Sequence, residues 1–108
     1  MAAIKSYTDI EQSKKLAEIL PIESADMYRI YDIPYAIPYE NRIGEAKPCW
    51  SLAALLDVLP EIQGSKPVIA LDDNYITYPH MSGLHFKADN LVDACVAMII
   101  KLHELKML

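Results

Sequence analysis

The sequence contains few glycines, and they lie far apart. Gly44, Gly64 and Gly83 are the three glycines in 108 residues, so the chain has no glycine-rich loop of the kind that cradles nucleotide phosphates. Basic residues are outnumbered as well: ten Lys and Arg against fifteen Asp and Glu give a formal net charge of −5. Affinity for nucleic acid comes mainly from clustered Lys and Arg that neutralise phosphates. The composition therefore argues against a nucleic-acid partner.

Cysteine and long apolar runs are also scarce. The two cysteines are Cys49 and Cys95, and residues 1–10 do not have the charged-then-apolar pattern of a secretory signal, so we expect free thiols in a reducing cytoplasm. The longest apolar run, residues 94–100, is far shorter than the ~20 residues of a membrane span. We therefore expect a soluble cytoplasmic protein with no membrane contact.

The length and composition are typical of a small globular protein. With 53% hydrophobic and 23% charged residues, the sequence predicts one domain over residues 1–108 with one core. A domain of this size buries a smaller fraction of its surface than a large one does. Self-association that covers further apolar area would therefore stabilise it.

Two segments in the first half of the chain have helical patterns. Residues 9–20 begin with a capping box, in which the Thr8 side chain would cap the helix and the Glu11 side chain would reach back to Thr8. Apolar side chains in this segment gather on one side, and i,i+4 charge pairs lie on the other. Residues 52–59 are rich in leucine and follow Ser51, a favourable N-cap residue. The sequence therefore predicts a helix over each segment.

The third helical segment, residues 91–107, closes the sequence. Asp89 and Asn90 precede it and are both suitable caps. Its apolar residues form a broad face that must pack against the rest of the chain. At ~1.5 to 3 kcal/mol for each fully buried aliphatic side chain, we expect this helix to be the largest contributor to the core.

The remaining regular segments favour strands. Residues 27–33 alternate and are rich in β-favouring types, and residues 66–71 and 75–78 flank a polar turn at residues 72–74. Residues 84–87 form a further alternating run. Strands joined by short turns cannot be parallel neighbours. The predicted fold is therefore α+β: a mostly antiparallel sheet of three or four strands with helices packed on it.

Tyrosine is concentrated in an irregular region that contains three prolines. The stretch DIPYAIPYE spans residues 32–40, and four tyrosines fall between residues 28 and 39. Tyrosine is favoured at protein interfaces because it offers a large contact area and a polar tip. One hypothesis is a protein-binding surface with these contacts: Tyr31, Tyr35, Tyr39 and Trp50. The other is an ordered loop whose aromatic residues shield an open sheet edge.

Residues that could carry chemistry are few. Cys49 precedes a predicted helix, a position at which a thiol can act as a nucleophile; the alternative is a small packed side chain. His80 and His85 follow the acidic turn at residues 72–74, and imidazole and carboxylate groups suit zinc or similar ions. Their spacing matches no standard metal motif, and we expect no metal, cofactor or catalytic residue.

Three blocks of the sequence carry a family resemblance: EQSKKLAEILPIESADM, PCWSLAALLDVLP and DNLVDACVAMIIKLHELKML. Together they cover a little under half of the chain and resemble small uncharacterised proteins from prophages and mobile elements of gut anaerobic bacteria. The resemblance implies a mobile-element origin and supplies no activity, cofactor or catalytic residue. The order of helices and antiparallel strands is also similar to small phage domains with a sheet between helices.

Two functional hypotheses follow from these patterns. The first is a non-enzymatic accessory protein of phage or mobile-element origin that binds another protein or itself. The alternative is a small enzyme or metal-binding domain that uses Cys49, or His80 and His85.

Overall fold

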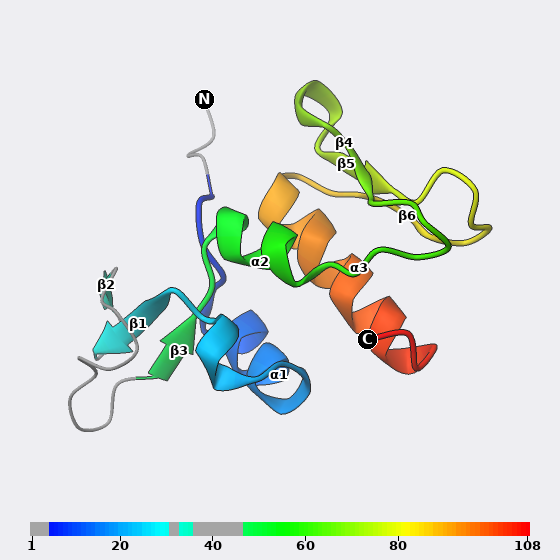
Figure 1. The fold of residues 1–108 in the computed structure, drawn as a ribbon. Helices are drawn as coiled ribbons and strands as arrows, with labels where there is room; N and C mark the ends of the chain where they lie inside the picture. The colour runs from blue at the N-terminus through cyan, green and yellow to red at the C-terminus, as the bar shows by residue number, and fades with distance from the viewer. Residues whose placement is uncertain (1–4, 31–32, 36–46) are drawn as a thin grey trace.

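The computed structural model describes residues 5–30, 33–35 and 47–108 (Figure 1). Short 3-10 turns occur at Ile22–Ser24 and Leu71–Asp73. Helices and antiparallel strands occur together, which confirms the predicted α+β class. The elements in chain order are α1 (Ile10–Ile19), β1 (Met27–Ile30), β2 (Ile33–Tyr35), β3 (Lys47–Cys49), α2 (Leu52–Val58), β4 (Val68–Ala70), β5 (Tyr75–Thr77), β6 (His85–Lys87) and α3 (Leu91–Glu104).

The strands of the described ranges lie in two three-stranded sheets, with the orders β2-β1-β3 and β4-β5-β6. A single sheet of three or four strands was predicted, and local sequence patterns do not specify which strands share a sheet. None of the helices in these ranges has the length and apolar character needed to cross a membrane.

The N-cap of helix α1 lies one residue later than predicted. Asp9 is the N-cap: its Oδ1 accepts from the Gln12 N–H at 2.8 Å, and the Gln12 Oε1 accepts from the Asp9 N–H at 3.1 Å. The box predicted from Thr8 and Glu11 is therefore wrong. The reason is tertiary, because the Thr8 side chain is buried and forms its hydrogen bonds elsewhere.

The first sheet divides a segment that was predicted to be one strand. β1 ends at Ile30, and Ile33 lies opposite Ile30 as the first residue of β2, so residues 27–33 do not form a continuous strand. Residues 34–48 were predicted to be irregular, yet parts of both β2 and β3 fall within them.

Each edge strand of this sheet has a proline at its centre. Tyr28 lies opposite Tyr35 on one side and Pro48 on the other, and Arg29 lies opposite Pro34. In an antiparallel sheet, backbone groups of successive residues point alternately to the two sides. Pro34 and Pro48 fit the positions whose backbone groups point away from β1, where no N–H is needed.

Helix α2 begins as predicted. Ser51 is its N-cap and accepts from the Ala54 N–H at 3.2 Å. Asp26, just before β1, holds this cap in turn: it accepts from the Ser51 N–H at 2.9 Å and from the Ser51 hydroxyl. The first sheet and α2 are therefore joined at the cap.

The second sheet contains the predicted hairpin and the predicted following strand. β4 and β5 are joined by a 3-10 turn that ends at Asn74, which has a left-handed conformation with φ 50°. Asparagine tolerates this conformation better than most residues. Each strand is shorter than predicted, with three residues.

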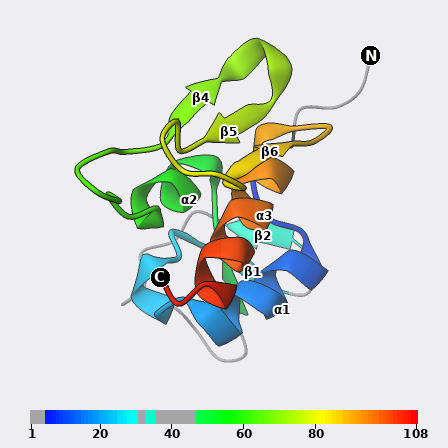
Figure 2. The ribbon, with the colours of Figure 1, turned by 90° about the vertical axis from the view of Figure 1, so that its right-hand side faces the viewer.

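Helix α3 lies between the second sheet and α1, and it packs against β5, β6, α2 and α1 (Figure 2). Asn90 caps it by accepting from the Asp93 N–H at 2.8 Å. The helix ends at Glu104 and not at residue 107. The predicted apolar face is confirmed, because the buried residues of this helix are Leu91, Val92, Ala94, Cys95, Val96, Met98, Ile99 and Leu102.

Candidate functional site

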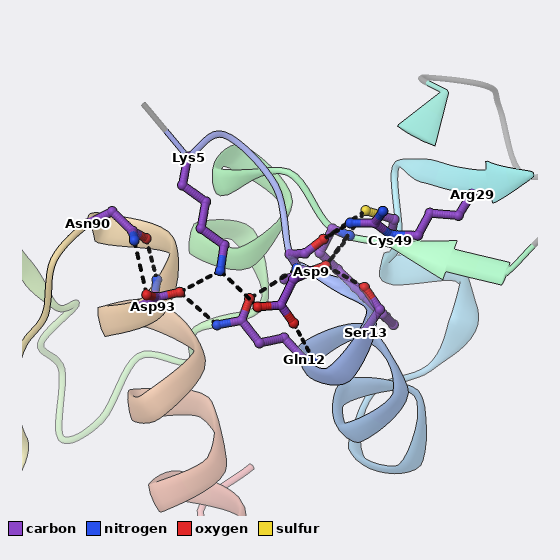
Figure 3. A network of polar contacts seen from close by, with 10 residues as sticks. Lys5, Asp9, Gln12, Ser13, Arg29, Cys49, Asn90 and Asp93 are labelled. Atoms are coloured by element: carbon purple, nitrogen blue, oxygen red, sulfur yellow. Dashed lines mark hydrogen bonds and ion pairs between the residues drawn. The ribbon is translucent and has the colours of Figure 1, made fainter. Parts of the chain in front are cut away.

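A network of polar side chains joins the N-terminal segment to α1 and α3 (Figure 3). Lys5 lies at its centre, with Nζ 2.7 Å from Asp93 Oδ1 and 3.1 Å from Asp9 Oδ2. Gln12 on α1 donates to the same Asp93 oxygen at 2.7 Å, and Asn90 donates to the other at 3.0 Å. Residues 88 positions apart in the sequence are thus held together by ionic hydrogen bonds, which are the stronger class of hydrogen bond.

The charges in this network stabilise one another. Burial alone would raise the pKa of Asp93, but hydrogen bonds from Lys5, Gln12 and Asn90 outweigh it and lower the pKa. Asp9 behaves in the same way, since the hydrogen bonds from the Gln12 N–H and from Lys5 overcome desolvation and lower its pKa. Burial lowers the pKa of Lys5, but the two carboxylates raise it overall. The network is therefore ionised at neutral pH.

Thr8 links this region to the core beneath it. The Thr8 hydroxyl accepts from the Trp50 N–H at 3.1 Å, lies 2.7 Å from the Ser13 hydroxyl and lies 3.7 Å from the Cys49 sulfur. The Thr8 carbonyl accepts from the Cys49 thiol at 3.4 Å and from the Arg29 guanidinium at 2.5 Å. The Arg29 guanidinium also lies over the ring of Tyr7, 5.6 Å from its centre.

Cys49, the candidate nucleophile, is fully buried at the end of β3. Both hydrogen bonds described for its thiol are to Thr8. Neither partner is a base that could take the thiol proton. Cys95 is also a free, buried thiol, and desolvation raises its pKa to about 11. A catalytic thiol requires thiolate character and access, and these contacts favour the packing interpretation of Cys49.

The candidate metal ligands lie at different places on the second sheet and its turns. His80 is exposed in the turn between β5 and β6. His85 is on β6, where its Nδ1 lies 2.5 Å from the Thr77 hydroxyl and its ring stacks on Tyr75. Asp72 and Asp73 are in the turn at the opposite end of β5 from Thr77. In the described part of the chain, no three His, Cys, Asp or Glu side chains come together as a metal site would require.

The residues predicted to bind a partner have different locations. Trp50 is fully buried, and its indole N–H donates to the Ser24 hydroxyl at 2.9 Å. Trp50 is therefore a core residue and not a surface contact, a correction to the prediction. Tyr35 is described through its backbone, which pairs with Tyr28 in the edge strand β2. Tyr31 and Tyr39 lie outside the described residues.

Sequence reasoning missed the most exposed apolar side chains of the strands and turns. Ile33 at the start of β2 is 55% exposed, Val68 in β4 is 53% exposed, and Leu71 just after β4 is 71% exposed. It also missed the Lys5–Asp93 ion pair. The two residues are 88 positions apart, so no local sequence pattern predicts their contact. The sequence holds only a weak signal for the exposure of the apolar side chains: Ile33 and Val68 lie on short edge strands, whose side chains are often open to solvent, and Leu71 lies in the turn after β4.

Comparison with known proteins gives no further assignment: no family model, no curated protein and no solved structure matches the chain.

Proposed function

We propose that this protein is a non-enzymatic accessory protein that works by contact with another protein, and that β2 and the tyrosine-rich sequence around it form the contact surface. The observation that carries the proposal is the exposure of Ile33, an isoleucine with more than half of its surface in solvent on an edge strand. The neighbouring Tyr31, Tyr35 and Tyr39 are of the type enriched in protein interfaces.

The backbone of the first sheet indicates how such a contact would form. Within β2 and β3, the outward-facing positions fit Pro34 and Pro48, which lack an N–H. A partner strand added at either edge would lose a donor at that position. Side chains, and not backbone pairing, would therefore provide most of the contact energy.

The polar network supports the non-enzymatic part of the proposal. Asp93 and Lys5 neutralise each other, and the Cys49 thiol is bonded to Thr8. Catalytic acids and bases usually have pKa values shifted toward neutral pH, whereas here the pKa of Asp93 is lowered and that of Lys5 is raised, which holds both groups in their ordinary charged states. Here the same types of group join the N-terminal segment to two helices. The phage or mobile-element origin is proposed from the resemblance of the three sequence blocks.

The test is capture of partners from the native host followed by mass spectrometry, with tagged wild-type protein and surface variants. We expect Ile33→Asp and the Tyr35→Ala/Tyr39→Ala double variant to lose the captured partner and to change the melting temperature by no more than about 4 °C, the range of a typical surface substitution. Leu105→Asp is the matched control, since Leu105 is an exposed apolar residue at the end of α3. It should leave capture intact.

The opposite pattern would show that the segment is structural. If the Tyr35→Ala/Tyr39→Ala protein binds every wild-type partner and melts at a much lower temperature, then β2 and the tyrosines cover the sheet edge and do not bind a partner.

A further inference from the structure

The second sheet has an edge of a different kind from those of the first. The Tyr78 N–H donates to the Leu84 carbonyl at 3.0 Å, so the backbone groups of Tyr78 point toward β6. Backbone groups of successive residues alternate between the two sides of a strand. Those of Ile76 therefore also point toward β6, and those of Thr77 point toward β4, where Val68 lies opposite.

The same alternation defines the free edge of β4. Val68 and Ala70 direct their backbone groups inward, to Thr77 and Tyr75. Ile69, between them, directs both its N–H and its C=O to the open side of the sheet. β4 is an edge strand (Figure 2). Unlike Pro34 and Pro48, Ile69 has both a backbone donor and a backbone acceptor on the open side of its strand.

One arrangement of a second copy satisfies both of these groups. If two β4 strands pair antiparallel about a two-fold axis at Ile69, each Ile69 N–H donates to the Ile69 carbonyl of the other copy. Two residues to either side of Ile69 lie Pro67, before the strand, and Leu71, the first residue of the 3-10 turn. Pro67 has no N–H to offer, and the Leu71 carbonyl that would have accepted it already accepts from Asn74 within the turn, at 3.4 Å. The missing donor therefore faces an acceptor that is already in use.

The charges at the two ends of β4 are also complementary. Exposed Lys66 lies before the strand, and exposed Asp72 and Asp73 lie in the turn after it. Rotation about Ile69 brings Lys66 of each copy to the acidic turn of the other. The same rotation places Val68 opposite Ala70 and Leu71 beside Pro67, so the most exposed apolar side chain near this edge would be covered.

We propose that β4 is a self-association edge, at which two copies of this chain pair antiparallel about Ile69 to form one six-stranded sheet. This self-association edge on β4 is separate from the β2 surface of the proposed function and does not depend on it. The interface is small, and interfaces below ~1,200 Å² belong to weak, transient complexes. We expect a dissociation constant on the order of tens of micromolar.

Analytical ultracentrifugation from about 10 µM to 1 mM tests the proposal. The weight-average mass should rise with concentration from 12.2 kDa toward twice that value. Lys66→Glu should weaken association about tenfold, because the two-fold axis places a repulsive pair at both ends of the interface. The double variant Lys66→Glu/Asp72→Lys should restore it to within about twofold of wild type. Amide exchange at Ile69 should slow as concentration rises.

Lys87→Glu is the matched control, because Lys87 is an exposed lysine on β6, the opposite edge of the same sheet. It makes the same change of charge and should leave association unchanged. A mass of 12.2 kDa at every concentration would overturn the proposal. So would association that Lys66→Glu leaves intact and Ile33→Asp abolishes, since the copies would then meet at β2. Loss of host-partner capture in the β2 variants bears only on the proposed function above.

Discussion

The Thr8 hydroxyl allows a sharp test of how buried polar groups stabilise this fold. Thr8 is fully buried, its hydroxyl accepts from the Trp50 N–H at 3.1 Å, and the Ser13 hydroxyl lies 2.7 Å away. Thr8→Val keeps the branched shape and removes the hydroxyl. Thr8→Ser keeps the hydroxyl and removes one methyl group. The pair therefore separates hydrogen bonding from packing at one position.

The expected magnitudes differ by more than the error of the measurement. In Thr8→Val the Trp50 N–H is left buried without its acceptor, which costs ~1–3 kcal/mol. The Ser13 hydroxyl also loses a partner, although a helical serine can turn back to a carbonyl of the preceding turn. We expect a total loss of about 2–3 kcal/mol for Thr8→Val, and about 1 kcal/mol for the methyl group removed in Thr8→Ser.

Trp50 is a convenient reporter because it is the single tryptophan and is fully buried. Urea unfolding followed by its fluorescence gives the midpoint and slope for each variant, and an unchanged slope shows that the free energy of unfolding itself has changed. Adding Ser13→Ala should cost less in Thr8→Val than in wild type, since the two hydroxyls interact. A Thr8→Val protein as stable as Thr8→Ser would refute the reasoning.

Two further predictions concern ionisable groups. Because the pKa of Asp93 is lowered in the folded state, its stabilisation is present above its unfolded pKa of ~3.9 and is lost as pH falls through the folded pKa. Asp93→Asn should be less stable than wild type at pH 7 by roughly 1 kcal/mol, a value discounted for partial exposure. The difference in stability should shrink as the pH falls below the unfolded pKa and should vanish below the folded pKa of Asp93; a difference that stays constant as the pH falls through this range would contradict the prediction. For Cys95, whose pKa is raised to about 11, thiol labelling at pH 8 of a Cys49→Ser protein should be ~100-fold slower when folded than in urea. Rapid labelling of the folded wild type but not of Cys49→Ser would instead favour a reactive Cys49.

Much of the fold could be predicted because its signals are local. Ser51 and Asn90 cap the helices they precede, and Asn74 ends the turn of the predicted hairpin. Caps and tight turns depend on a few neighbouring residues, so their chemistry is visible in a short window of sequence. The capping box of α1 was misplaced by one residue because Thr8, an equally good cap, is buried against Trp50.

The candidate site was far less predictable. Tryptophan is a residue type favoured at interfaces, yet the Trp50 ring is buried in the core, where its indole N–H donates to the Ser24 hydroxyl. Lys5 and Asp93 have ordinary surroundings in the sequence and meet only because α3 packs against α1. Residue type gives a preference for surface or core, and the packing of distant elements determines the outcome.

The sequence by itself determined where α2 and α3 begin, where the β4–β5 hairpin turns, and that α3 has an apolar face to bury, since each depends on interactions between near neighbours. Only the tertiary structure decided that the strands of the described ranges form two sheets, that Pro34 occupies a position whose backbone points away from β1, and that the N–H and C=O of Ile69 point to the open side of β4. Strand pairing joins residues far apart in the chain, and its free energy depends on the packing of the whole molecule.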